Sequence, residues 1–335
     1  MRLRIIQKTS QFEHIVFSLQ KGELGIEFKK LGINVFIVPK LIPRIFGFFF
    51  YLIFLLKTKP NIVHAMPWVP NLFARISKLI PGSTNYKIIC DYHGIAYLGR
   101  MQILIDKLTI HLSDKIFFVS SEVKDWLENK WNKTIPQSKA FIFKNFVSAD
   151  EFKFSQQNRN VLRSKLGLGK LDFVLGIVAR LDKIKRIDFL IKFCTPIIKK
   201  FENFKLLICG EGPLKTELQC LAKKEGIYEN IIFMEFEHKD LSKIYSAFDA
   251  FVLCSESEGL PTVLLEAAAN GCPVFLSKNL DRFNYIFTQK QNDLRMLQSP
   301  TSHVLRNKNH KSFLCPEFEQ DLFIEKIILQ YLELK

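Results

Sequence analysis

The chain has 335 residues, of which 48% are hydrophobic and 24% are charged, a composition typical of a globular protein and not of a disordered one. This length exceeds that of one ordinary hydrophobic core and favours two domains. The net charge of +15 is uneven, because residues 1–155 contain 22 Lys and Arg against 11 Asp and Glu. We expect an anionic partner for this half. No helix-turn-helix, RNA-recognition or zinc-finger pattern points to nucleic acid, so an anionic membrane surface is the better candidate.

The amino-terminal residues are basic but lack an apolar stretch of signal-peptide length, which predicts a cytoplasmic location. The seven cysteines are scattered, with no CxxC pair and no histidine at zinc spacing. We therefore expect free thiols in a reducing compartment and no bound metal.

The first half alternates apolar segments with helical ones. Strands are predicted within residues 14–19, 33–39, 61–68, 86–94, 115–119 and 139–143, and helices within 22–32 and 121–131. The longest apolar run, residues 45–56, lies between Lys40 with Arg44 and Lys57 with Lys59. A membrane-spanning helix needs about 20 residues, so this run is too short to cross a bilayer. Two interpretations stay open: a helix buried in its own domain, or a helix lying in the surface of a membrane.

The second half repeats a strand–helix pattern. Strands are predicted at 172–180, 204–210, 230–236 and 250–255, and a helix follows each of them. This spacing predicts a parallel, doubly wound α/β sheet, in which ligands bind beyond the carboxyl ends of the strands.

The segment from Ser255 to Val274 contains two glutamates, Glu258 and Glu266, with seven residues between them. Gly259 is expected to form a turn and Pro261 to be the first residue of a helix, which Asn270 and Gly271 are expected to end. Backbone amides from Leu260 onward can meet a phosphate. Two carboxylates beside an anion site suit a ligand that has both hydroxyls and phosphates, such as a nucleotide sugar.

Three further groups follow predicted strands. Arg180 and Lys185 place two cations after the first strand of the second half, either as an anion clamp or as ordinary loop charge. Gly210 and Gly212 predict a tight turn that brings backbone close to a ligand. His93 ends a strand of the first half and can hydrogen-bond a sugar or phosphate oxygen near neutral pH. For His64 a loop-capping role is the better interpretation.

These segments together resemble retaining glycosyltransferase family 4, over roughly residues 10–275. The resemblance implies a GT-B fold, with two Rossmann-like doubly wound domains facing across a cleft: an acceptor-side domain at 1–155, a nucleotide-sugar domain at 156–316, and a last helix at 317–335 that packs back on the first domain. It implies a hexosyltransferase that takes a sugar from a nucleotide-sugar donor, expected to be a UDP-sugar. The implied acceptor is a lipid-linked saccharide or polysaccharide of O-antigen, capsule or lipopolysaccharide type, at the inner face of the cell membrane.

The resemblance also implies residue roles. Arg180 and Lys185 hold the diphosphate, so no metal or other cofactor is needed. Glu258 holds the sugar hydroxyls, Glu266 the ribose, and His93 lies near the bond that breaks. Gly210, Gly212, Gly259, Leu260 and Pro261 shape the donor pocket.

Two departures from the family pattern leave alternatives open. The family opens with a strand, a Gly-Gly loop and a helix, and this first β-α unit has no counterpart in the sequence. Residues 278–316 match neither of the two later family segments. The chain is therefore expected to be a glycosyltransferase, with an impaired glycosyltransferase-like binding protein and a sugar-nucleotide epimerase on the same fold as the alternatives.

Overall fold

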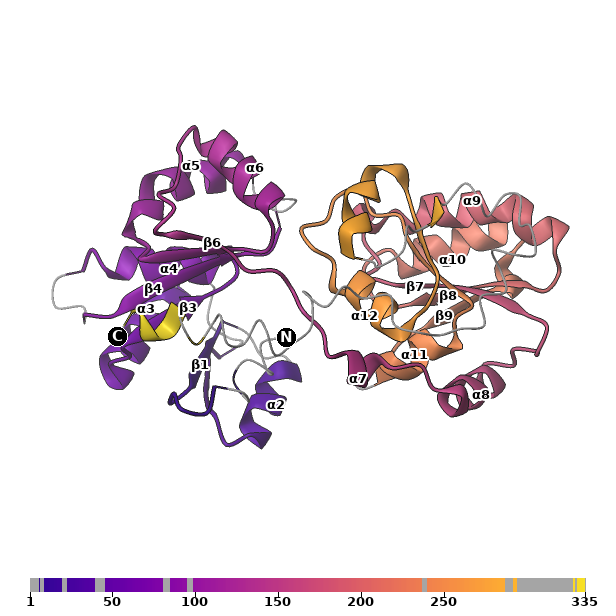
Figure 1. Ribbon diagram of the computed structural model, residues 1–335, viewed down its shortest axis with the longest axis horizontal. Helices are drawn as coiled ribbons and strands as arrows, with labels where there is room; N and C mark the ends of the chain where they lie inside the picture. Colours follow the sequence, from indigo (N-terminus) through magenta and orange to yellow (C-terminus); the bar gives the residue numbers. More distant parts are fainter. Residues whose placement is uncertain are drawn as a thin grey trace. The chain divides into compact units, whose positions relative to one another are not determined.

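The computed structural model describes residues 6, 9–19, 23–39, 46–80, 85–94, 99–236, 240–286, 292–293, 328 and 330–334. The chain forms two compact units (Figure 1): unit 1 comprises residues 1–145 with 321–335, and unit 2 comprises residues 146–320. The division thus falls ten residues before the expected boundary at 155. The segments expected to carry the two later family motifs lie mostly outside the described residues, and so does most of the predicted last helix.

Unit 1 contains parallel strands in two sheets. A two-stranded sheet pairs β1 (Ile15–Ser18) with β2 (Asn34–Ile37), and a four-stranded sheet has the order β3-β4-β5-β6. The strands of the second sheet are β3 (Ile62–Ala65), β4 (Lys87–Tyr92), β5 (Lys115–Phe118) and β6 (Ala140–Ile142). Each of them falls within a predicted strand, because short apolar runs bounded by polar residues are a strong signal for buried parallel strands.

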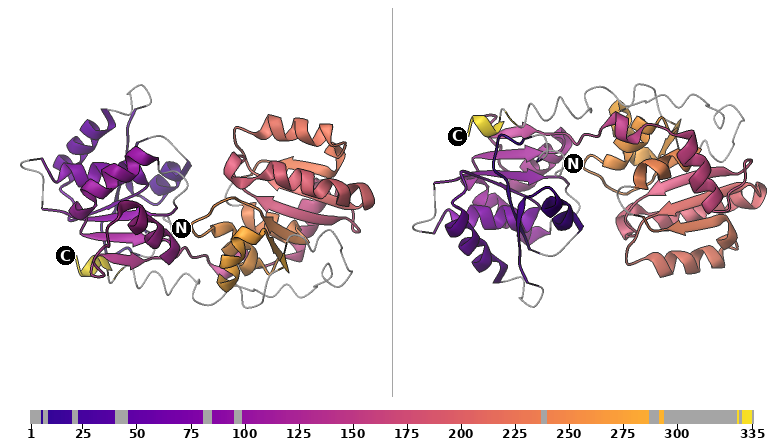
Figure 2. Two further views of the ribbon diagram at one scale, coloured as in Figure 1. Left: turned by 90° about the horizontal axis from the view of Figure 1, so that it is seen from above. Right: turned by 90° about the horizontal axis from the view of Figure 1, so that it is seen from below.

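Helices of unit 1 pack in the sequence order α3, α4, α5, α6, each beside the next. Their bounds are α3 (Gly47–Thr58), α4 (Trp68–Ser77), α5 (Arg100–Thr109) and α6 (Ser121–Trp131), while α2 (Glu23–Lys30) packs on β2. The carboxyl-terminal residues contact the face of the four-stranded sheet that lies away from these helices. There the Tyr331 hydroxyl lies 2.6 Å from His64 Nδ1. Figure 2 shows these residues, in yellow, on the side of the sheet away from the helices.

Helix α3, which contains most of the apolar run at 45–56, is buried on one side only, and contact of its other side with a membrane stays a prediction. Tyr51, Phe54 and Leu55 are buried, whereas Phe49 and Leu56 are 61% and 59% exposed. One side of the helix therefore belongs to the core and the other faces solvent.

Unit 2 is a doubly wound parallel sheet of strand order β12-β11-β10-β7-β8-β9. Its strands are β7 (Phe173–Val178), β8 (Phe204–Cys209), β9 (Ile231–Met234), β10 (Ala250–Leu253), β11 (Val274–Leu276) and β12 (Asn292–Asp293). Its α-helices are α7 (Ala149–Phe152), α8 (Gln156–Lys165), α9 (Ile187–Lys200), α10 (Lys215–Lys224), α11 (Leu241–Ala247) and α12 (Thr262–Asn270). Apolar side chains from β7, β8, β10 and α9 form one buried cluster, which fixes the strands that end at the candidate site.

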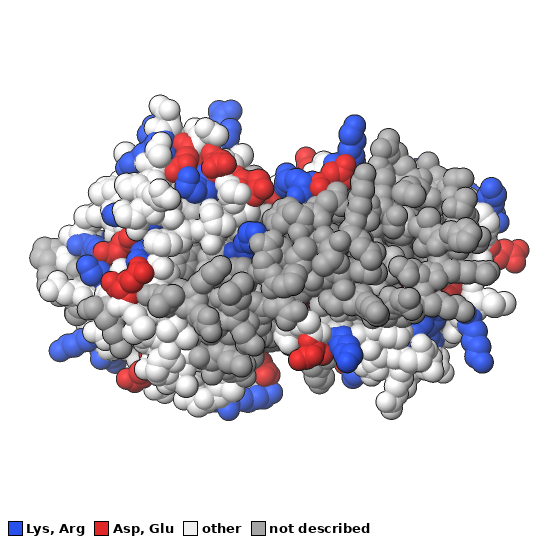
Figure 3. All heavy atoms as spheres, in the orientation of Figure 1, with Lys and Arg blue, Asp and Glu red and all other residues white. Residues whose placement is uncertain are grey.

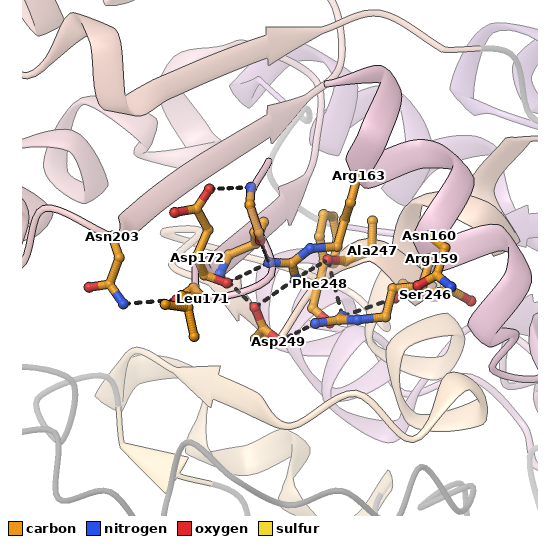
Figure 4. A network of polar contacts seen from close by, with 12 residues as sticks. Arg159, Asn160, Arg163, Leu171, Asp172, Asn203, Ser246, Ala247, Phe248 and Asp249 are labelled. Atoms are coloured by element: carbon orange, nitrogen blue, oxygen red, sulfur yellow. Dashed lines mark hydrogen bonds and ion pairs between the residues drawn. The ribbon is translucent and has the colours of Figure 1, made fainter. Parts of the chain in front are cut away.

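Helix α8 begins directly after the domain boundary expected at residue 155, and its arginines attach it to the sheet (Figure 4). Arg159 and Arg163 both bind the carboxylate of Asp249, and Arg163 Nη1 lies 3.0 Å from Asp249 Oδ2. The same carboxylate oxygen accepts a 2.8 Å hydrogen bond from the backbone N–H of Val174 in β7. Because this helix packs through arginines, its sequence lacks the apolar periodicity that predicts a helix.

Candidate functional site

The carboxyl ends of β7, β8 and β10 carry the predicted site residues of unit 2. These strands are neighbours in the sheet and run parallel, with Val178 of β7 paired to Cys209 of β8. The loops that follow them therefore emerge at one edge, where a doubly wound sheet binds its ligands.

An ion pair between Lys185 and Glu258 joins two of these loops. Lys185 Nζ donates to Glu258 Oε1 at 2.6 Å, and the side chains are only 18% and 11% exposed. Lys185 ends the 3₁₀ turn η3 (Lys183–Lys185), which Asp182 caps by accepting a hydrogen bond from the Lys185 N–H. On the other side, Arg282 donates to the Glu258 carbonyl at 2.9 Å. The structure thus brings together a cation and a carboxylate that are 73 residues apart.

Arg180 lies in the same loop but points outward. Its side chain is 68% exposed, and its Nε lies 3.6 Å from Asp182 Oδ2. Arg180 therefore remains open to solvent at the sheet edge, whereas Lys185 is enclosed by its partner.

Gly210 and Gly212 bring the loop after β8 against the loop after β7. Both have positive φ, 148° and 159°. A Cβ atom at Gly210 would lie 1.9 Å from the carbonyl oxygen of Ala179, and one at Gly212 would lie 2.4 Å from that of Leu181. The glycines therefore allow close backbone packing between two loops, and their approach to a ligand stays a prediction.

Helix α12 begins at the end of the third loop. Pro261 is its N-cap, with ψ of 119°, so Thr262 and not Pro261 is the first helical residue. Gly259 and Leu260 lead into this cap, and Gly271 with φ of 74° ends the helix as predicted.

Glu266 lies one turn into α12 and does not join the Lys185–Glu258 pair. It is 6% exposed, and its Oε2 accepts a 2.8 Å hydrogen bond from the Tyr245 hydroxyl of α11. Burial, and secondarily the Glu266 charge, raise the pKa of Tyr245 well above its usual value. Tyr245 therefore stays protonated and keeps donating to Glu266.

In unit 1 one carboxylate lies between two histidines. Oδ2 of the buried Asp91 is 3.3 Å from His93 Nε2 and 3.1 Å from His64 Nε2. His64 lies within β3 and not in a loop, which corrects the loop-capping interpretation. Asp91 was not predicted as a site residue, although it precedes His93 by two residues. A single carboxylate inside a buried strand has no sequence pattern that marks it as functional.

Other neighbours of the site were also missed. Asp182 and Arg282 contact Lys185 and Glu258, and Asn279 donates to the carbonyls of Ser255 and Glu256 at 2.9 and 3.0 Å. Asn279 and Arg282 follow β11, the strand next to β10, so only sheet order identifies them as neighbours of the glutamate loop.

Comparison with known proteins assigns the fold. The structure of Anabaena Alr3699/HepE in complex with UDP and glucose matches 99% of this chain and 95% of its own, with a TM-score of 0.83 at 13% identity. Sucrose-phosphate synthase from Thermosynechococcus elongatus matches with a TM-score of 0.77 at 16% identity, over 99% of this chain and 92% of its own. The chain has the GT-B fold, with two Rossmann-like units.

Sequence comparison assigns the family. Residues 10–151 match the family described as Glycosyltransferase Family 4, and residues 158–295 match that described as Glycosyl transferases group 1. The chain belongs to glycosyltransferase family 4. The match within unit 2 contains every site residue predicted there.

Curated relatives cover part of the chain. The putative glycosyltransferase EpsF of Bacillus subtilis is 27% identical over 57% of this chain and 51% of its own length. The O-antigen biosynthesis glycosyltransferase WclY of Escherichia coli is 28% identical over 68% of this chain and 64% of its own length. The chain thus spans about half the length of the first of these relatives.

Proposed function

We propose that this protein is a retaining glycosyltransferase that moves a sugar from a UDP-sugar to a lipid-linked or polysaccharide acceptor of a cell-surface glycan. The observation that carries the proposal is the enclosed Lys185–Glu258 pair at the carboxyl edge of the unit 2 sheet. A nucleotide sugar has a diphosphate for the cation and hydroxyls for the carboxylate. A UDP donor is supported by the relatives of this fold that bind UDP, and a glycan acceptor by the O-antigen relative.

The cations neutralise the diphosphate as the sugar–phosphate bond breaks. Arg180, exposed in the same loop, grips phosphate oxygens with its planar guanidinium, and Lys185 turns from Glu258 toward the leaving phosphate. Fixed cations at the point where charge develops are a strong source of transition-state stabilisation. This arrangement assigns to side chains a task that a metal ion performs elsewhere.

The carboxylates bind the donor's hydroxyl groups. Glu258 accepts from the transferred sugar, and Glu266, oriented by Tyr245, accepts from the ribose. The backbone N–H groups at the start of α12, after Gly259, Leu260 and Pro261, hydrogen-bond the phosphate of the donor. No side chain of unit 2 is assigned as a nucleophile, so the acceptor attacks on the face that the diphosphate leaves, and a phosphate oxygen takes the acceptor proton.

His93 is the proposed contribution of unit 1. Asp91 accepts from its Nε2 and orients the ring, and the imidazole hydrogen-bonds a hydroxyl of the transferred sugar in this scheme. Asp91 is thus a positioning residue in this scheme.

The test is UDP release from UDP-sugars by the purified full chain. Lys185→Met should lower kcat about 100-fold, because it removes one of the positive charges that neutralise the leaving diphosphate. Glu258→Gln should raise KM for the donor and lower kcat, because the amide cannot accept as many hydrogen bonds. Glu256→Gln is the matched control, since Glu256 is an exposed carboxylate of the same loop, and it should leave both constants unchanged.

Calorimetric titration with UDP separates the alternatives. UDP binding without turnover would identify a glycosyltransferase-like binding protein, and interconversion of UDP-sugars without transfer would identify an epimerase. Absence of both UDP binding and turnover would refute the nucleotide-sugar site itself.

A further inference from the structure

Three neighbouring helices of unit 1, α3, α4 and α5, present apolar side chains to solvent. Phe46, which caps α3, and Phe49 and Leu56 within it are 57%, 61% and 59% exposed. Val69 of α4 is 38% exposed, and Leu79, just past its end, is 63% exposed. On α5, Met101, Leu104 and Leu108 are 67%, 48% and 63% exposed. We call these eight residues the apolar helix face.

On α5, three apolar residues at helical spacing face solvent. Met101, Leu104 and Leu108 are three and four residues apart, which aligns them on one face of the helix. The polar Asp106 lies on the opposite, inward face and is fully buried against Arg75 of α4. The ion pair thus fixes α5 with its apolar row turned outward. An amphipathic helix on a globular domain has the reverse orientation.

The exposed charges on the helices of this face are basic. Lys57 and Lys59 end α3, and Arg100 and Lys107 lie on α5. Lys78, which follows α4, is neutralised by Asp114, whose Oδ2 lies 2.6 Å from its Nζ. Helices α3 and α4 contain no Asp or Glu, and the one acidic residue of α5 is buried. By contrast, the next helix, α6, carries Glu122, Asp125 and Glu128. Figure 3, which views one side of the molecule, shows white areas on unit 1 with both blue Lys and Arg groups and red Asp and Glu groups beside them.

We propose that the apolar helix face is a docking surface for an anionic lipid bilayer. The apolar side chains of these neighbouring helices insert at the boundary between lipid headgroups and acyl chains. The flanking Lys and Arg side chains contact the negative headgroups. The proposal extends membrane contact from α3, which the sequence suggested, to α4 and α5. No helix among the described residues is long and apolar enough to cross a membrane, so this contact lies on the bilayer surface.

Charge complementarity selects the bilayer over a second copy of the chain. A symmetric dimer through this face would place Lys57, Arg100 and Lys107 of one copy near the same cations of the other. Like charges in contact oppose such a pairing. An anionic bilayer neutralises them instead.

The experiment is flotation of the full chain with vesicles of phosphatidylglycerol and phosphatidylcholine, compared with vesicles of phosphatidylcholine alone. We expect binding to the anionic vesicles that weakens in high salt. The combined change Met101→Gln, Leu104→Gln and Leu108→Gln should lower the partition coefficient at least tenfold. Lys57→Gln and Lys107→Gln should each lower it about fivefold, because each basic residue near an anionic surface contributes about a factor of that size.

The matched control lies in unit 2, where Val161 and Leu171 are 62% and 86% exposed. Changing both to Gln removes exposed apolar area elsewhere, and binding should stay within twofold of the wild type. Circular dichroism confirms folding of each variant. All substituted side chains are largely exposed, so loss of fold is not expected.

Three outcomes overturn the proposal. The first is wild-type protein that fails to float with anionic vesicles, and the second is a triple α5 variant that floats as well as the wild type. The third is sedimentation velocity showing a lipid-free dimer that the α5 variant converts to monomer, which would make this face a subunit interface. Flotation is measured without nucleotide, so its result is independent of the proposed transferase activity.

Discussion

Gly210 lets the loop after β8 pack directly against the backbone of the loop after β7. Its Cβ position lies 1.9 Å from the Ala179 carbonyl oxygen, and the contacted atom is backbone, which cannot rotate away. Gly210→Ala should therefore push apart the loops after β7 and β8, at a cost of about 2 kcal/mol or more in the unfolding free energy of unit 2. Urea unfolding followed by circular dichroism measures this.

Gly169 provides the control for that substitution. It lies in the same unit, and a Cβ there would meet only the Asp172 carboxylate at 3.5 Å, an ordinary contact. Gly169→Ala should change the unfolding free energy by less than about 1 kcal/mol. Equal effects of the two substitutions would contradict the role given to the Gly210 contact.

The sequence predicted the positions of the two glutamates of the site but not the side chains that contact them. Glu258 follows a buried strand, so its place at the sheet edge was predictable, but its ion pair with Lys185 was not. Glu266 was placed on the following helix by the same segment, but its contact with Tyr245 of α11 was not predictable. Spacing along one helix places a carboxylate on a face, whereas its partner depends on which helix packs there.

At the level of elements, α8 depends on Asp249. This carboxylate binds Arg159 and Arg163 and accepts from the Val174 N–H, so it links the helix to the sheet (Figure 4). Asp249→Ala would leave two partly buried guanidinium groups without their shared counterion. We expect a loss of about 3 kcal/mol in the unfolding free energy of unit 2.

Asp240→Ala tests whether any ion pair of unit 2 would have that effect. Asp240 pairs with Lys243 at 3.0 Å, and the two side chains are 34% and 51% exposed. An exposed pair of this kind contributes less than about 1 kcal/mol. Hydrogen exchange should also show faster exchange of the α8 amides in Asp249→Ala and unchanged exchange in Asp240→Ala.

Prediction of elements succeeded where apolar periodicity was strong. All four predicted strands of the second half match β7 to β10, and the helix over Thr262–Asn270 has the predicted end at Gly271. Helices α4, α5 and α8 were not predicted. Their buried sides carry polar side chains, Arg75 in α4, Asp106 in α5 and Arg163 in α8, so apolar residues do not mark the side of each helix that packs inward.

For the whole molecule, the tryptophans distinguish the two units. Trp68, Trp126 and Trp131 all belong to unit 1, and unit 2 contains none. Tryptophan fluorescence therefore reports the unfolding of unit 1, and circular dichroism reports both units.

This distribution gives a test of where the nucleotide binds. UDP at about 100 times its Kd should stabilise unit 2 by about 2.7 kcal/mol. The circular dichroism transition should gain a component at higher urea, while the fluorescence transition stays in place. Glu256→Gln should behave as the wild type, and a shift of the fluorescence transition alone would contradict a UDP site in unit 2.

The sequence by itself determined the two-domain organisation, the parallel doubly wound class, the family and the strand ends that carry Arg180, Lys185 and Glu258. These follow from local signals, because periodicity, turns and caps depend on residues close together in the chain. Tertiary structure decided the partners: Lys185 with Glu258, Tyr245 with Glu266, Asp91 with His64 and His93, and the outward apolar rows of α3 to α5. Those depend on the order of strands in a sheet and on which helices pack together, and such contacts join residues far apart in sequence.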